Sequence, residues 1–290
     1  MAVDLQKLKR KMRGVTSTRQ VTRALQMVSA MKMRKAQDQS AASRAYREAL
    51  VDLMKTFDAS PGQAVPDLAV TPSGNKVLVA VFASDRGLCG PYNTNVLNAV
   101  ARLAREIGHE NLEIKAVGWK VGTTLRRRGF NILSCERRPG TTADWDSFLV
   151  NFSRELLAAW GTGEYARIGL LYSGLRGLTV LKPELENWLP LSGSDTGAGA
   201  DRVPPSSNYI DEPGATQVLA EAIRRLLNNE LLSARLHSEA SEHVARMMAM
   251  DNATRNAEEM FHSLQLTFNK ARQAKITQEI CEIVSGANAI

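Results

Sequence analysis

The residues with the clearest chemical potential lie in a glycine-containing segment. Residues 84–93 read SDRGLCGPYN and follow a continuous apolar run, residues 76–83. Glycines that follow a strand and open a helix can hold a phosphate on backbone N–H groups. The third glycine of the dinucleotide-binding pattern is missing, however, and Pro91 removes a backbone donor where the phosphate would lie. We therefore interpret the segment as a tight turn and expect no cofactor.

Other residue types that perform chemistry form no recognisable pattern. Cys89, Cys135 and Cys281 are far apart and include no CxxC pair, so neither a disulfide framework nor a metal cluster is predicted. His237 and His243 lie six residues apart, on different faces of a helix. The sequence contains no GxxxxGKS or GxxxxGKT motif and no Ser/His/Asp or paired-carboxylate arrangement. We predict no catalytic residue, no metal and no enzymatic activity of the chain itself.

The net charge of +7 is concentrated at one end of the chain. Residues 1–35 carry ten basic residues and one acidic residue, or +9, and the other 27 basic and 29 acidic residues give −2. A basic segment attracts acidic protein, nucleic acid or an anionic membrane surface, and charge alone leaves the three open. No apolar run approaches the ~20 residues that cross a bilayer, so no integral membrane segment is predicted.

The chain is predicted to begin with one long helix, from about residue 3 to residue 57. Steps of three and four residues mark one face of it: Leu5, Leu8, Met12, Val15, Thr18, Thr22, Leu25 and Val28. Gly14 is the one glycine before the first proline, Pro61. A helix of ~55 residues rising ~1.5 Å per residue would be roughly 80 Å long.

A second long helix is predicted from about Thr216 to the end. Ten steps cover 35 residues, the heptad period of a left-handed coiled coil, along Leu236, Ala240, Val244, Met247, Met250, Ala253, Ala257, Met260, Leu264, Phe268 and Ala271. An exposed seam of this length would promote aggregation, so the seam needs a partner. We predict that the two terminal helices pair antiparallel. The pattern alone also fits an intermolecular coiled-coil scaffold.

The middle of the chain alternates between short apolar segments and helical patterns. The run 76–83 is typical of a buried parallel strand, and further short strands are expected near residues 112–118, 130–133, 166–172 and 178–181. This alternation predicts a Rossmann-like α/β domain with a mostly parallel sheet. The predicted fold class is α/β with long terminal helices. Its parts are an N-terminal shaft helix, 1–58, an α/β domain, 76–208, and a C-terminal shaft helix, 214–290, that pairs with the first.

Several segments resemble the gamma subunits of F-type ATP synthases. Residues 18–30, TRQVTRALQMVSA, resemble the N-terminal shaft of that family, and residues 84–93 resemble its SDRGLCGxxN turn. Residues 250–257, MDNATRNA, and 269–280, NKARQAKITQEI, resemble its C-terminal motifs. The resemblance runs end to end. It implies a central rotor stalk that couples ion-driven rotation of a membrane c-ring to conformational change in catalytic beta subunits.

The resemblance also implies contact residues for the catalytic part of such a complex. Arg272, Gln273 and Thr277 match positions of a C-terminal contact with the beta subunit, and Leu25 matches a shaft position where many relatives carry methionine. The implied partners here are the alpha and beta subunits. The basic first helix would complement acidic loops of the beta subunit.

At the other end, Tyr209 and Glu212 match the segment where relatives meet the c-ring and the epsilon subunit. Membrane contact would then occur only through the c-ring, and no nucleic acid would be bound. The implied location is the cytoplasmic face of a bacterial inner membrane, as a peripheral protein.

Two other functional classes fit the residues without the resemblance. An α/β enzyme with long helical arms predicts that the isolated chain binds a ligand. A nucleic-acid-binding coiled coil predicts binding to DNA that weakens strongly with salt.

Overall fold

The computed structural model describes residues 5–55, 64–69, 72–176, 180–191, 212 and 214–287. These residues form two compact units. The terminal unit consists of Met1–Ala30 and Arg246–Ile290, and the α/β unit consists of Met31–Ala245. Helices α1 (Leu5–Lys55) and α7 (Ala215–Ala287) each contribute to both units. With 51 and 73 residues, they confirm the prediction of long terminal helices.

The α/β unit is built on one five-stranded sheet with the order β3-β2-β1-β4-β5. The strands are β1 (Lys76–Phe82), β2 (Leu112–Val117), β3 (Asn131–Glu136), β4 (Tyr165–Arg176) and β5 (Val180–Leu189). The first four are parallel, and β5 is antiparallel to β4. The mostly parallel sheet is as predicted, although β4 and β5 are longer than the apolar runs that indicated them.

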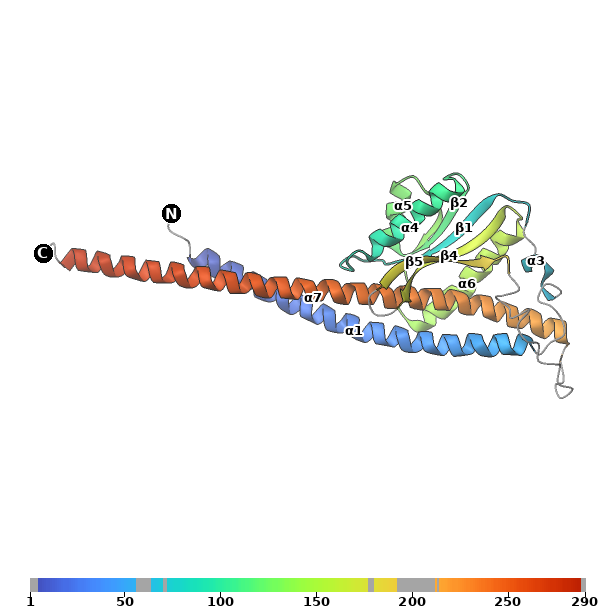
Figure 1. Cartoon of the computed structure of the whole chain (residues 1–290), viewed down its shortest axis with the longest axis horizontal. Helices are drawn as coiled ribbons and strands as arrows, with labels where there is room; N and C mark the ends of the chain where they lie inside the picture. The colour runs from blue at the N-terminus through green and yellow to red at the C-terminus, as the bar shows by residue number, and fades with distance from the viewer. Residues whose placement is uncertain are drawn as a thin grey trace. The chain divides into compact units, whose positions relative to one another are not determined.

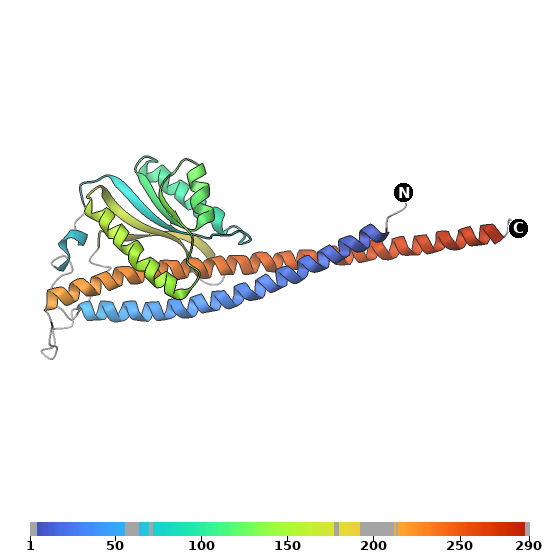
Figure 2. The ribbon, with the colours of Figure 1, turned by 180° about the vertical axis from the view of Figure 1, so that it is seen from behind.

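Helices cover both faces of this sheet, as Figure 1 shows. The helices of the unit are α3 (Pro66–Ala69), α4 (Tyr92–Ile107), α5 (Trp119–Arg127) and α6 (Thr142–Gly161), together with the parts of α1 and α7 within it. Helices α4 and α5 pack on one face, and α6 and α7 on the other. Figure 2 shows α6 and α7 from behind.

The two-sided cover explains the continuous apolar sequence of β1. Leu78, Ala80 and Phe82 belong to the core cluster shared with α6 and α7, whereas Val77 and Val79 belong to the cluster shared with α4 and α5. Successive side chains of a strand point to opposite faces. A strand that is buried on both sides is therefore expected to be a nearly continuous apolar run.

In the terminal unit, the buried stripe of α1 is a strict heptad that includes polar residues. Buried or half-buried positions alternate steps of three and four, along Leu5, Leu8, Met12, Val15, Arg19, Thr22, Gln26 and Ser29. The expected stripe positions Thr18 and Val28 are exposed, so that part of the prediction is wrong. The predicted stripe was assigned from apolar and small residues. It missed Arg19 and Gln26 because hydropathy does not indicate that a polar side chain is buried.

The stripe of α7 in the same unit requires a similar correction. It runs through Met250, Thr254, Ala257, Phe261, Leu264, Phe268 and Ala271 in alternating steps of four and three. Met260, predicted on the stripe, is 57% exposed, and Phe261 is covered instead. The average period was correct, but two positions were placed one residue too early, at Ala253 and Met260 instead of Thr254 and Phe261.

None of the helices in the described part of the chain combines the length and hydropathy needed to cross a bilayer.

Candidate functional site

Polar contacts join α1 and α7 in the described part of the terminal unit. The hydroxyls of Thr22 and Thr254 lie 2.7 Å apart. One turn away, the Gln26 side-chain amide donates to a carboxylate oxygen of Asp251 at 3.0 Å. The Arg19 guanidinium lies over the Phe261 ring, 5.9 Å from its centroid. The motif residues Asp251 and Thr254 therefore hold the helices together.

Beyond Ala271, α7 is uncovered on every side. Every side chain described from Arg272 to Ser285 is exposed. The exposed residues include four aliphatic side chains: Ile276, Ile280, Ile283 and Val284. Exposed apolar residues gathered on one helical segment are a mark of an interaction site.

The residues predicted to contact a beta subunit lie at the start of this exposed segment. Arg272, Gln273 and Thr277 all face solvent, and the Thr277 hydroxyl donates to the Gln273 carbonyl at 3.0 Å. The structure brings these three together on little more than one turn. Leu25, in contrast, is half-buried on α1, where the Ser29 hydroxyl donates to its carbonyl at 2.7 Å.

Of the two residues predicted to meet the c-ring and the epsilon subunit, the structure describes only Glu212. Glu212 is exposed, just before α7 begins. Tyr209 lies outside the described residues.

The SDRGLCG segment forms a turn whose side chains bind other parts of the α/β unit. Leu88 has φ 61° and Gly90 has φ 53°, so the chain twice adopts the left-handed conformation. The Asp85 carboxylate accepts the backbone N–H of Trp119 at 2.7 Å and that of Arg138 at 3.0 Å. These bonds tie the ends of β1, β2 and β3 together.

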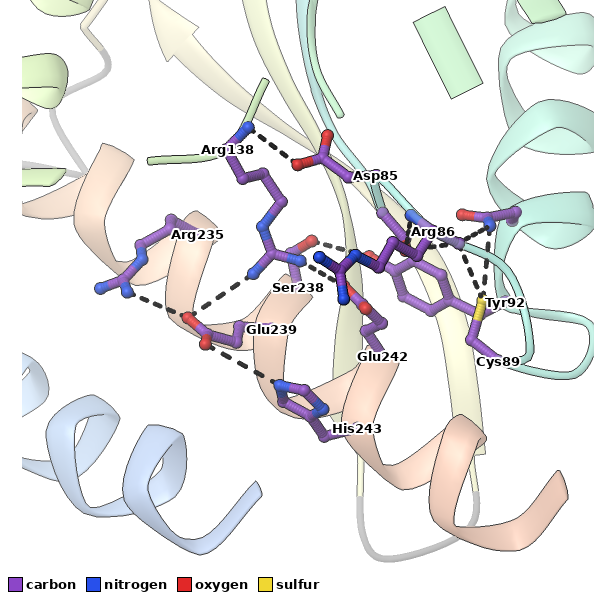
Figure 3. A network of polar contacts seen from close by, with 12 residues as sticks. Asp85, Arg86, Cys89, Tyr92, Arg138, Arg235, Ser238, Glu239, Glu242 and His243 are labelled. Atoms are coloured by element: carbon purple, nitrogen blue, oxygen red, sulfur yellow. Dashed lines mark hydrogen bonds and ion pairs between the residues drawn. The ribbon is translucent and has the colours of Figure 1, made fainter. Parts of the chain in front are cut away.

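Arg138 then connects this turn to α7, as Figure 3 shows. Its guanidinium is hydrogen-bonded to the Glu242 carboxylate and lies 3.6 Å from that of Glu239. Arg235 also pairs with Glu239, at 3.0 Å, and its guanidinium lies 4.6 Å from the centroid of the Trp145 ring. We call the set Asp85, Arg138, Arg235, Glu239 and Glu242 the Arg138 network.

Burial sets the electrostatics of this network. Burial lowers the pKa of Arg138, but the carboxylates of Glu242 and Glu239 outweigh it, and the pKa is raised overall. Burial lowers the pKa of Arg235, against the opposing influence of Glu239. Burial also raises the pKa of Tyr92, whose hydroxyl lies 2.7 Å from that of Ser238. Arg138 is therefore held as a cation, and Tyr92 as a neutral phenol.

Sequence reasoning missed the Arg138 network. Arg235 and Glu239 are four residues apart on a helix, which is an ordinary solvated pair by sequence. What distinguishes Arg235 and Glu239 from a solvated pair is their position among core residues, because the neighbouring Ala234, Leu236 and Ala240 are all buried. Charged residues surrounded by core positions on a helix must find partners, yet the sequence does not identify Arg138 as one of them.

Metal-binding clusters and cavities give no further candidate site in the described part of the chain. Among the described residues, no three His, Cys, Asp or Glu side chains are placed to hold a metal ion. A cavity of about 230 Å³ lies between α1, α6 and α7 and is lined by Tyr46, Val150 and Arg225. A buried side-chain oxygen of Asn228, which also lines it, has no hydrogen-bond partner among the residues that the structure describes. We assign no ligand to it.

The arrangement defines a class of protein: an α/β domain whose chain ends form long helices that contact each other and leave an exposed helical terminus. The family model described as ATP synthase matches residues 4–290. The ATP synthase gamma chain of Pelotomaculum thermopropionicum is 39% identical over 294 residues, and that of Geotalea uraniireducens is 34% identical over 295 residues. Each alignment covers 99% of both chains. The chain belongs to the ATP synthase gamma chain family.

Solved structures share the fold. A chain of the Euglena gracilis mitochondrial ATP synthase, in a structure of its OSCP, F1 and c-ring parts, aligns with a TM-score of 0.66 at 20% identity, covering 98% of this chain and 94% of that one. A chain from the central stalk and c-ring of Tetrahymena thermophila mitochondrial ATP synthase aligns with a TM-score of 0.56 at 21% identity, covering 80% and 99%. The family and gamma-chain matches do not support a nucleic-acid-binding protein or an unrelated coiled-coil scaffold.

Proposed function

We propose that this chain is the central rotor stalk of an F-type ATP synthase. It would couple ion-driven rotation of the c-ring to conformational change in the catalytic beta subunits. The observation that carries the proposal is the fully exposed end of α7, residues 272–285, on a chain that matches gamma chains over 99% of its length. A helical terminus with exposed aliphatic residues needs a surrounding partner, and a ring of alpha and beta subunits would supply one.

In this proposal the chain is a non-catalytic subunit without a cofactor of its own. ATP chemistry belongs to the partners, and ion transport is a property of the whole complex. The proposed boundaries remain 1–58 and 214–290 for the two shaft helices and 76–208 for the α/β domain.

Two contact regions are proposed. Arg272, Gln273 and Thr277, with Leu25 on α1, would face the beta subunit. Tyr209 and Glu212 would face the c-ring and the epsilon subunit. The chain would then be a peripheral protein of the cytoplasmic face of a bacterial inner membrane, attached only through the c-ring, and would bind no nucleic acid.

Charge supports the first contact. Most of the ten basic residues of 1–35 lie on exposed positions of α1, among them Lys9, Arg10 and Lys32. Positive side chains around a rotating surface would be attracted to acidic loops without a fixed geometry. Each exposed pair contributes only about 0–1 kcal/mol, which is compatible with contacts that form and break as the shaft turns.

The test is to mix this chain with purified alpha and beta subunits and to measure ATP hydrolysis with and without it. We expect a stable complex and cooperative turnover only when the chain is present. The double variant Arg272→Ala with Gln273→Ala should weaken assembly or turnover, whereas Lys275→Ala, which changes an equally exposed cation on the same turns, should have little effect. Binding of DNA or a nucleotide by the chain alone, with no complex formed, would refute the proposal.

A further inference from the structure

Helix α7 is attached to the α/β unit in two chemically different ways. From Leu219 to Ala234 its buried residues, apart from Asn229, belong to an apolar cluster with α6 and the sheet. From Arg235 to Glu242 the described side-chain contacts of the helix are mainly polar, and they reach several other segments. The change from apolar to polar attachment occurs within one turn.

The polar part collects bonds from separate elements of the unit, as Figure 3 shows. Arg138, in the connection after β3, reaches Glu239 and Glu242. Tyr92, at the start of α4, reaches Ser238 at 2.7 Å. In addition, the Ser241 hydroxyl donates to the Ser173 carbonyl of β4 at 2.7 Å. Three elements therefore hold two turns of α7.

The position of Arg138 is itself fixed at both ends. Its backbone N–H donates to the Asp85 carboxylate at 3.0 Å, and Asp85 also binds the N–H of Trp119. Its guanidinium end is inside the network, where the Arg138 side chain is 15% exposed and that of Glu242 is 6% exposed. Arg138 therefore has little freedom to follow α7 if the helix moves.

Apolar and polar attachments resist motion differently. Burial of apolar surface is non-directional, so an apolar face still gains most of its stabilisation after a small rotation or slide. A guanidinium–carboxylate pair depends on the position and direction of its donors. A buried ion pair adds little net stability because desolvation offsets the attraction, but breaking one is costly, and such pairs are best attested as devices that fix register.

We propose that Arg138, Glu239 and Glu242 are positioning residues that fix the rotation of α7 about its own axis against the α/β domain. This inference rests on the proposed function. A load applied near Glu212 and resisted near Arg272 would twist α7 along its length. The Arg138 network braces the helix at Arg235–Glu242, close to the end of the α/β unit at Ala245.

The test uses the complete complex with Arg138→Met and Glu242→Gln variants. Methionine keeps an unbranched side chain, and the backbone N–H of residue 138 can still donate to the Asp85 carboxylate. Glutamine keeps the size of Glu242 and removes its charge. The matched control is Lys115→Met, which breaks the 2.5 Å ion pair between Lys115 of β2 and Glu155 of α6 and does not involve α7.

Two quantities are measured. The first is the angular fluctuation of a probe on the α/β domain while the alpha–beta ring is immobilised and catalysis is paused. The second is the number of ions pumped per ATP hydrolysed in membrane vesicles. For both network variants we expect a broader fluctuation and fewer ions per ATP. ATP hydrolysis by the complex with alpha and beta alone should remain near wild type, because that activity places no load on the α/β domain.

Each result decides the inference. If the fluctuation and the pumping ratio of both network variants equal those of Lys115→Met, the network only supports the fold and the inference is wrong. The inference is also wrong if the number of ions pumped per ATP decreases in both variants only in proportion to a decrease in their melting temperature. If Arg138→Met does not assemble, Glu242→Gln alone decides by the same readouts. Failure of the proposed function is distinct, because the wild-type chain would then neither assemble nor rotate.

Discussion

The hydroxyl oxygens of Thr22 and Thr254 lie 2.7 Å apart across the two helices of the terminal unit, although 232 residues separate them in sequence. Each hydroxyl is also within bonding distance of a carbonyl on its own helix, Arg19 at 3.0 Å and Met250 at 2.8 Å. Two hydroxyl protons cannot fill three bonds at once. The pair therefore contributes a polar layer to the seam that shares its protons between inter-helix and intra-helix bonds.

This sharing predicts non-additive substitutions. Thr22→Val alone should destabilise the helix pair by about 1 kcal/mol, because Thr254 loses its partner across the seam. Thr22→Val combined with Thr254→Val should cost less than the sum of the single changes, since two valines fill the same space without polar groups. Chemical denaturation of the four proteins measures the coupling, and strictly additive costs would contradict the shared-proton layer.

A second prediction concerns a closely packed glycine of the α/β unit, Gly122. A Cβ added at Gly122 of α5 would lie 2.3 Å from the sulfur of Cys135 and 3.0 Å from the Cβ of Ala116. Gly122→Ala should therefore destabilise the chain by about 1–3 kcal/mol through overpacking. Adding Cys135→Ala should recover part of that loss in thermal unfolding. No recovery would mean that the Cβ of Ala116, not the thiol, sets the limit.

Gly14, on α1, provides the opposite case. An added Cβ there meets nothing within 4 Å, and the residue lies inside a long helix. Gly14→Ala should raise stability by about 0.5–1 kcal/mol, because alanine loses less backbone entropy than glycine on helix formation. The melting temperature of the isolated chain checks this. A decrease would indicate that α1 bends at Gly14 in the stable form.

The fourth prediction is a dependence on pH. His237 is stacked on Tyr172, with ring centroids 5.9 Å apart, and burial lowers its pKa against the opposing effect of Glu186. The unfolded chain, where histidine has a pKa of about 6.5, then binds a proton before the folded chain does. Stability is therefore fully present above that pH and falls as the pH drops below it.

His237→Phe keeps the ring stack and removes the titration. Its free energy of unfolding should decrease less than that of the wild type between about pH 7.5 and pH 5.5, as measured by urea unfolding. The exposed His262 on the same helix gives the control, His262→Phe, which should retain the wild-type slope. Identical slopes for wild type and His237→Phe would contradict the prediction.

The elements of this fold could be read from the sequence because hydropathy and period agree there. Residues 77–82 are apolar on both faces of the strand, and α1 contains no proline and only one glycine, Gly14. The helix register was partly missed where heptad positions carry Arg19, Gln26 and Thr254. Polar side chains at these positions are buried because they contact a partner helix that is far away in sequence. The pattern of one helix alone therefore does not show that they are buried.

The candidate site divides in the same way. Arg272, Gln273 and Thr277 could be proposed from a motif, and the structure places them together on an exposed helix. The pairing of Arg138 with Glu242 joins residues 104 positions apart through a loop, and only the packed sheet brings them together. Local patterns predict elements and surfaces, whereas buried polar contacts depend on the tertiary fold.

The most direct test of the central claim is the rotation of single complexes. Alpha and beta subunits would be fixed to a surface, this chain added, and a probe attached to its α/β domain through an introduced cysteine, with Cys281 replaced because it is exposed. The account predicts rotation in one direction that requires ATP and stops in steps set by the catalytic sites. A complex that hydrolyses ATP while the probe stays fixed, or moves only by random fluctuation, would contradict it.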